Sequence, residues 1–373
     1  MILSDCVCNA SAVYTTNRVK ASPILLTKEH LADGKAQAVI VNSGNANACA
    51  PFGMENARRQ AKAGARALGV SEENVIVAST GVIGQTLNVA VIEQGMPELC
   101  AAAAHTAAGS DAAAHAIMTT DTVKKELAVE TVIGGKTVRM GGIAKGSGMI
   151  HPNMGTMLCF LTTDCAISSE MIKSALLETV QVSFNRISVD GDTSTNDTCC
   201  VLANGLAGNP VITEKGPDYD AFVEALRALC VELAKKMASD GEGATHLITC
   251  TVTGAGSEQS AETVAKSVIG SALTKAAIFG ADANWGRVLC AMGYSKAPFR
   301  PEYVDISFSS AVGAVAVCRG GMGLDFDEEA ARSILSQDEV VIDVHLHEGE
   351  HEATCWGCDL TYEYVKINGD YRT

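Results

Sequence analysis

The sequence predicts an α/β protein in which helices pack in layers on β-sheets. Short apolar runs typical of buried strands alternate with longer segments whose apolar residues recur every three or four positions. The hydrophobic fraction is 47% and the charged fraction only 19%, so a chain of 373 residues can bury a sizeable core. Because no periodic repeat and no Ser/Pro-rich linker interrupts the chain, we expect one compact body.

The predicted strands are short apolar or alternating runs, most of them bounded by Gly, Asn, Asp or Ser. The clearest is a hairpin over 125–132 and 136–143, because Gly134-Gly135 between the two runs is a strong signal for a two-residue turn. In chain order, the strands are expected at 36–41, 75–78, 125–132, 136–143, 157–163, 247–253, 304–308, 314–317, 340–346 and 361–367.

The predicted helices have apolar residues on one face. In 218–239, for example, Phe222, Leu226 and Leu229 recur at helical spacing. The helix over 55–68 is expected to end at Gly69, since glycine adopts the left-handed conformation of a C-cap. In chain order, the helices are expected at 55–68, 89–108, 169–184, 218–239, 261–273 and 327–335.

Composition excludes several classes of function. A net charge of −15 disfavours nucleic acid as a partner, because a polyanion is repelled by such a surface. No apolar run reaches the roughly 18 to 20 residues that a membrane helix needs. The first residues lack the basic and apolar regions of a signal peptide, so we expect a cytoplasmic protein.

We expect neither a metal nor a disulfide site. The 14 cysteines are scattered, mostly in apolar surroundings, and resemble reduced thiols of a core, Cys49 and Cys290 among them. Cys355 and Cys358 form a C-x-x-C pair, but alternating residues typical of a strand follow it, which disfavours a redox or zinc site. The histidines at 345, 347 and 351 lie in a polar, Glu-rich stretch, where a solvated surface is a better interpretation than a metal site.

Nucleotide loops and classical triads are also disfavoured. The glycine-rich run 141–148 lacks the spacing of a phosphate-binding loop, and the sequence has no G-x-S-x-G elbow. Thr156 remains as a candidate nucleophile. It follows Gly155, before an apolar strand, where self-cleavage would free an α-amine of pKa about 8 to accept the hydroxyl proton. A plain turn is the better interpretation from spacing alone.

A set of ordered motifs changes this balance. The run 145–156, KGSGMIHPNMGT, resembles the segment around the cleavage site of the ornithine acetyltransferase family, many members of which also have glutamate N-acetyltransferase activity. Further stretches resemble the same family in the same order: 15–17 (TTN), 42–48 (NSGNANA), 79–84 (STGVIG), 118–122 (MTTDT), 190–197 (DGDTSTND), 240–245 (DGEGAT), 282–287 (DANWGR) and 366–373 (KINGDYRT).

The resemblance implies the layered fold shared with self-processing aminopeptidases, and autocatalytic cleavage between Gly155 and Thr156. The products would be an alpha chain, 1–155, and a beta chain, 156–373, intertwined in one α/β body and assembled as two alpha and two beta chains. Family members begin some tens of residues earlier, so an edge strand is expected to be missing. Gly155 stands where the family more often has alanine.

The resemblance also implies the reaction. Thr156 would take an acetyl group from N-acetylornithine and pass it to glutamate in a ping-pong reaction of arginine biosynthesis. Thr80 and Gly81 match the oxyanion-hole pair. The matched substrate-binding positions are Thr119 (or its neighbour Thr120), Lys145, Thr156, Glu242, Asn368 and Thr373.

Lys145 would bind an α-carboxylate, and Glu242 either a cationic ornithine amine or the α-amine of Thr156. No cofactor is implied, and acetyl-CoA stays open as a second acetyl donor. The alternatives are an aminopeptidase or amidase that uses water as acceptor, and an uncleaved, non-enzymatic protein.

Overall fold

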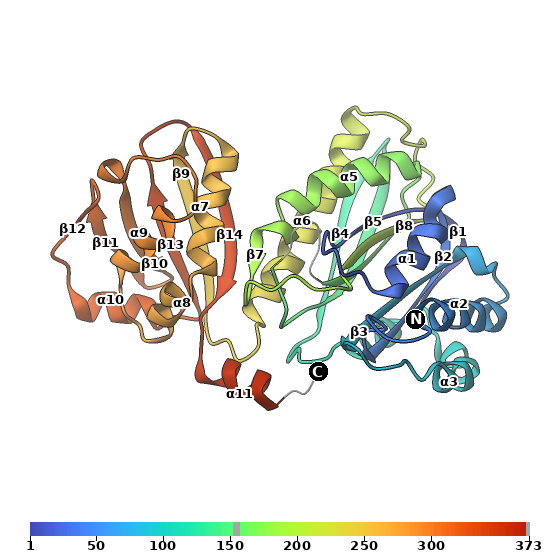
Figure 1. Ribbon diagram of the computed structural model, residues 1–373. Helices are drawn as coiled ribbons and strands as arrows, with labels where there is room; N and C mark the ends of the chain where they lie inside the picture. The colour runs from blue at the N-terminus through green and yellow to red at the C-terminus, as the bar shows by residue number, and fades with distance from the viewer. Residues whose placement is uncertain (152–156, 371–373) are drawn as a thin grey trace.

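The molecule contains two seven-stranded sheets, which lie side by side in two lobes (Figure 1). This computed structural model describes residues 1–151 and 157–370. Helices flank both sheets, as Figure 1 shows, so the predicted α/β class is confirmed. Among the described helices, none is long and apolar enough to span a membrane.

The first sheet has the strand order β3-β2-β1-β8-β6-β5-β4. Its central strand β8 pairs antiparallel with β1 and parallel with β6, and its side chains pack into cores on both faces of the sheet. Its strands are β1 (Ile2–Tyr14), β2 (Lys35–Asn45), β3 (Val75–Val82), β4 (Lys125–Ile133), β5 (Lys136–Lys145), β6 (Leu158–Thr163) and β8 (Thr198–Ala203).

The helices of this lobe contact the first sheet or one another. Helix α6 lies along β4 and β5, and α1 contacts β3, whereas α3 packs on α2. Their bounds are α1 (Ser22–His30), α2 (Gly53–Leu68), α3 (Val89–Ala102), α4 (Ala107–Ala116), α5 (Ser169–Gln181) and α6 (Pro217–Ser239).

The second sheet has the order β12-β11-β10-β13-β9-β14-β7 and belongs entirely to residues after 156. Its strands are β7 (Ile187–Ser188), β9 (Leu247–Ala255), β10 (Asp305–Ser310), β11 (Gly313–Arg319), β12 (Met322–Gly323), β13 (Glu339–His345) and β14 (His351–Cys358). The remaining helices are α7 (Glu258–Gly270), α8 (Ala272–Phe279), α9 (Trp285–Gly293), α10 (Glu328–Leu335) and α11 (Tyr362–Asp370).

Two local predictions are confirmed together with their physical reasons. Gly134 and Gly135 both have positive φ and connect β4 to β5 with Ile133 opposite Lys136, the geometry of a two-residue hairpin. Gly69 ends α2 in the left-handed conformation, and its N–H donates to the carbonyl of Ala65.

Two helices predicted as continuous are each divided. The stretch 89–108 covers α3 and only the first two residues of α4, because the Thr106 hydroxyl accepts the N–H of Gly109 and starts a new helix. Likewise, 261–273 covers the end of α7 and the start of α8, where the Ser271 hydroxyl accepts the N–H of Thr274. A side-chain cap competes with the continuing helix at both positions.

The strand predicted over 361–367 is wrong, because these residues belong to helix α11. The Thr361 hydroxyl donates to the carbonyl of Gly243 (2.7 Å) and accepts the N–H of Tyr364 (3.4 Å), which fixes the first turn. The alternating residues therefore form part of a helix and pair with no strand. Strands β1 and β8 and helices α1 and α9 were not predicted at all, although β1 and β8 are central to the first sheet.

All 14 cysteines are free thiols, and most are buried as predicted. Cys49 and Cys290 are exposed, so their assignment to the core is wrong. Cys355 lies in β14 directly opposite Cys250, and complete burial raises the pKa of both thiols. Within residues 1–151 and 157–370, no group of three or more His, Cys, Asp or Glu side chains could hold a metal ion.

Candidate active site

Three of the predicted site residues, Thr80, Gly81 and Lys145, lie at the ends of strands of the first sheet, the first two in β3. Lys145 is the last residue of β5 and is paired with Leu158, the first residue of β6. Thr156, Gly155 and Thr373 lie outside the described residues. Met157, which follows Thr156 in the chain, is buried, and its carbonyl accepts the N–H of Thr198 at 2.8 Å.

Lys145 meets two of the predicted threonines. Its ammonium donates to the Thr119 hydroxyl at 2.9 Å and to the Thr80 hydroxyl at 3.5 Å, although the three residues are far apart in the sequence. Of the two neighbouring candidates, it is Thr119 rather than Thr120 that has this contact. Lys145 is only 7% exposed, so a carboxylate that reached it would meet a cation shielded from water.

Gly81 is required by the close approach of two strands. It has φ +124° and lies opposite Gly44 in the parallel pair β2–β3, where a Cβ would come within 2.3 Å of the Gly44 carbonyl carbon. Asn196 ties this turn to the loop after β2, because its amide donates to the carbonyls of Ala46 (2.6 Å) and Ser79 (2.8 Å). Three of the predicted motifs thus meet around Thr80 and Gly81.

Glu242 and Asn368 also come together. The Asn368 amide of α11 donates to a Glu242 carboxylate oxygen at 2.7 Å. The Glu242 N–H donates to the carbonyl of Ser147 at 3.0 Å, and the Glu242 carboxylate packs on Gly148. Glu242 and Asn368 are therefore attached to the same turn that begins at Lys145.

A buried cluster of charged side chains next to Lys145 was not predicted. Its members are Asp121, Lys125 and Asp240, with Lys125 Nζ 2.6 Å from the Asp121 carboxylate and 2.5 Å from that of Asp240. Burial alone would raise the pKa of Asp121, but the ammonium groups of Lys145 and Lys125 outweigh it and lower that pKa. The signal in the sequence was the charged run directly after Thr119 and Thr120, which reads equally well as a solvated surface.

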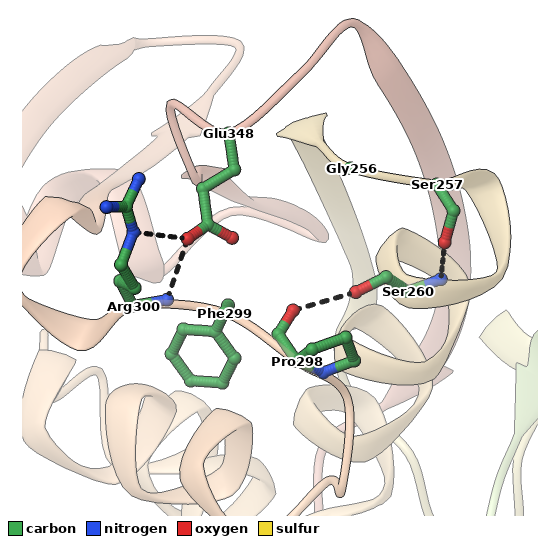
Figure 2. Close-up of a pocket in the computed structure, with 7 residues that line it drawn as sticks. All are labelled: Gly256, Ser257, Ser260, Pro298, Phe299, Arg300 and Glu348. Atoms are coloured by element: carbon green, nitrogen blue, oxygen red, sulfur yellow. Dashed lines mark hydrogen bonds and ion pairs between the residues drawn. The ribbon is translucent and has the colours of Figure 1, made fainter.

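A cavity of about 640 Å³ lies in the second lobe and contains none of the predicted residues (Figure 2). The side-chain Nε and the backbone N of Arg300 each donate to the Glu348 carboxylate at 3.0 Å. The Ser260 hydroxyl donates to the carbonyl of Pro298. The Ser257 hydroxyl accepts the N–H of Ser260 and so caps α7. These contacts satisfy one another and assemble no nucleophile with a base.

In class, the molecule is an α/β enzyme, with a buried ammonium, two hydroxyls and a carboxylate gathered at one end of a sheet. The model of the ArgJ family matches residues 1–373, and the chain belongs to that family. The resemblance inferred from the motifs is thereby confirmed, and the chain is an enzyme of arginine biosynthesis.

Similar proteins cover the whole chain. It is 50% identical to the arginine biosynthesis bifunctional protein ArgJ 1 of Clostridium acetobutylicum, over 100% of this chain and 91% of that protein. It is 53% identical to the ArgJ protein of Symbiobacterium thermophilum, over 100% and 92%. A crystal structure of the ArgJ protein from Bacillus halodurans aligns with a TM-score of 0.53 at 46% identity, over 56% of this chain and 97% of the solved chain.

Proposed function

We propose that the chain cleaves itself between Gly155 and Thr156, and that Thr156 then transfers an acetyl group from N-acetylornithine to glutamate. The observation that carries this proposal is the convergence of Thr80 and Thr119 on the Lys145 ammonium, beside the turn that holds Glu242. Family membership supports the same reaction.

Self-cleavage needs no outside group except water. The Thr156 hydroxyl attacks the Gly155 carbonyl carbon, the C–N bond breaks, and the hydroxyl proton passes to the departing nitrogen. Water then hydrolyses the resulting ester, which leaves a carboxylate on Gly155 and a free α-amine on Thr156. Glycine at 155 tolerates the strained backbone that such an attack requires.

Acetyl transfer then follows in two steps. The Thr156 oxygen attacks the acetyl carbonyl of N-acetylornithine while the α-amine accepts the hydroxyl proton, and ornithine departs with a proton on its nitrogen. The amine of glutamate then attacks the acetyl ester, the bond from the acetyl carbon to the Thr156 oxygen breaks, and a proton passes from the amine to that oxygen as N-acetylglutamate leaves. The Thr80 hydroxyl and the Gly81 N–H stabilise the oxyanion of each tetrahedral intermediate, at about 3 kcal/mol per donor.

The substrate residues follow from charge. Lys145 binds the α-carboxylate that both substrates share. Glu242, held by Asn368, faces a cationic amine, either that of ornithine or the α-amine of Thr156. Thr373, which matches a substrate-binding position of the family, completes the proposed set. No cofactor takes part, and acetyl-CoA would serve only as a second acetyl donor.

The two segments would remain together after cleavage. Strands β6 and β8 follow residue 156, yet they lie between β1 and β5 of the first sheet, so separating the segments would break two strand pairings, β1–β8 and β5–β6. The alignment with the solved Bacillus halodurans chain covers 56% of this chain. Residues 156–373 make up 218 of the 373 residues, which is a similar share. Assembly as two alpha and two beta chains in the cytoplasm completes the proposal.

The test is a transfer assay on the purified, cleaved protein. We expect N-acetylglutamate to form from N-acetylornithine and glutamate, with little free acetate. Acetate alone would identify the hydrolase that uses water, and no turnover at all would contradict both. Adding acetyl-CoA and glutamate without N-acetylornithine tests the second donor.

Gly148→Ala should weaken the binding of the substrate amine. The added methyl would lie 2.4 Å from the Glu242 carboxylate, which must then move from Asn368. We expect KM for N-acetylornithine to rise roughly tenfold, which corresponds to about 1.4 kcal/mol. Gly95→Ala is the matched control, because its methyl would meet nothing within 4 Å. If kcat falls while KM stays constant, Glu242 instead holds the α-amine of Thr156.

A further inference from the structure

Asp121 contacts Lys145, the next residue Gly146, and Thr119, whose hydroxyl is bound by Lys145. In the described part of the chain, it is the one carboxylate within salt-bridge distance of the Lys145 ammonium, with Oδ2 3.7 Å from Nζ. The same Oδ2 accepts the N–H of Thr119 at 3.2 Å, and Oδ1 accepts the N–H of Gly146 at 2.7 Å. The Asp121 side chain is fully buried, so water does not screen these contacts.

We propose that Asp121 is a positioning residue, which aims the Lys145 ammonium at Thr119 and Thr80 and keeps it charged in a buried site. This inference rests on the proposed function, in which Lys145 binds a carboxylate. Asp121 itself does not touch the substrate. It acts by fixing the end of β5 through Gly146 and the preceding loop through Thr119.

The charge of Lys145 depends on the groups around it. Burial lowers the pKa of Lys145, and the positive charge of Lys125 lowers it further, whereas Asp121, Asp197 and Glu242 raise it. Asp121 has the strongest of these raising effects. If Asp121 became neutral, the pKa of Lys145 would fall further, and the ammonium would lose its proton at a lower pH. Carboxylate binding would then fail at a lower pH as well.

Asp240 provides a matched control within the same cluster. Its carboxylate lies 2.5 Å from Lys125 Nζ and accepts hydrogen bonds from Thr122, but Lys145 is not among its ion-pair partners in the described structure. Asp121→Asn and Asp240→Asn therefore remove the same kind of buried charge, and each takes one carboxylate from Lys125. Only Asp121→Asn also removes the carboxylate that pairs with Lys145.

The experiment compares the pH dependence of kcat/KM for N-acetylornithine in the wild type and both variants, with cleavage verified by intact mass. For Asp121→Asn we expect the alkaline limb to move to lower pH by about one unit or more. For Asp240→Asn we expect the alkaline limb at the same pH as in the wild type, even if the thermal stability of this variant falls. An Asp121→Asn limb that coincides with the wild type, or an equal shift in both variants, would overturn the positioning role.

A second measurement needs no turnover. Lysine labelled with ¹³C at Cε reports the charge of Lys145 in the wild-type protein by NMR, with Lys145→Arg assigning the signal. We expect a charged Lys145 at pH 8, and a neutral one would overturn the inference. If wild-type protein transfers no acetyl group, the proposed function fails, and the NMR titrations of wild type and Asp121→Asn still decide the relation between Asp121 and Lys145.

Discussion

Thr156→Ala is expected to leave a single chain of 38.7 kDa where the wild type yields fragments of 155 and 218 residues. Alanine has no hydroxyl to attack the Gly155 carbonyl, and without cleavage no α-amine is freed. We therefore also expect acetyl transfer to fall by roughly 10⁴-fold or more, as when a covalent nucleophile is removed. Intact mass and the transfer assay measure the two effects.

Two further variants make this result specific. Thr156→Ser keeps a hydroxyl and an α-amine, so it should still cleave and retain part of the activity. Thr137→Ala alters an exposed threonine of β5 and should cleave and turn over as the wild type does. Complete cleavage of Thr156→Ala would show that another residue, or another protein, cuts the chain.

Lys145→Met is expected to have the second largest effect. Methionine keeps most of the length of the side chain but loses the ammonium that pairs with the α-carboxylate, and nothing else near Thr80 and Thr119 replaces it in the proposed mechanism. Removing one member of a buried, hydrogen-bonded charge pair costs about 2 to 5 kcal/mol. We therefore expect kcat/KM for N-acetylornithine to fall on the order of 10² to 10³-fold, measured on protein whose cleavage has been verified.

The matched control lies at the other end of the same strand. Lys136 begins β5 and is exposed, so Lys136→Met should leave kcat/KM within about twofold of the wild type, as surface substitutions usually do. Should Lys145→Met behave in the same way, the carboxylate must bind elsewhere, and the proposed role of Lys145 would be abandoned. Thermal denaturation of both variants separates this effect from loss of folded protein.

Much of the fold was predictable because it depends on local chemistry. The turn at Gly134-Gly135 requires positive φ, which glycine adopts readily, and the C-cap at Gly69 requires it too. Segments with one strong periodicity, such as α6, were also located to within a residue or two at each end. Segments whose state depends on distant partners were missed, as β1 and β8 show, or misassigned, as α11 shows.

The candidate site was likewise predictable only in part. By itself, the sequence determined which family the chain belongs to, and the ordered motifs pointed to Thr80, Lys145 and Glu242 without any coordinates. The tertiary structure alone decided that Thr119 and not Thr120 meets Lys145, and that Asp121 stands behind it. The physical reason is distance along the chain. Residues 80, 119 and 145 meet only because sheet pairing brings strand ends and loops together, and a charged residue such as Lys125 reads as surface until its partner Asp240, 115 positions away, is in place.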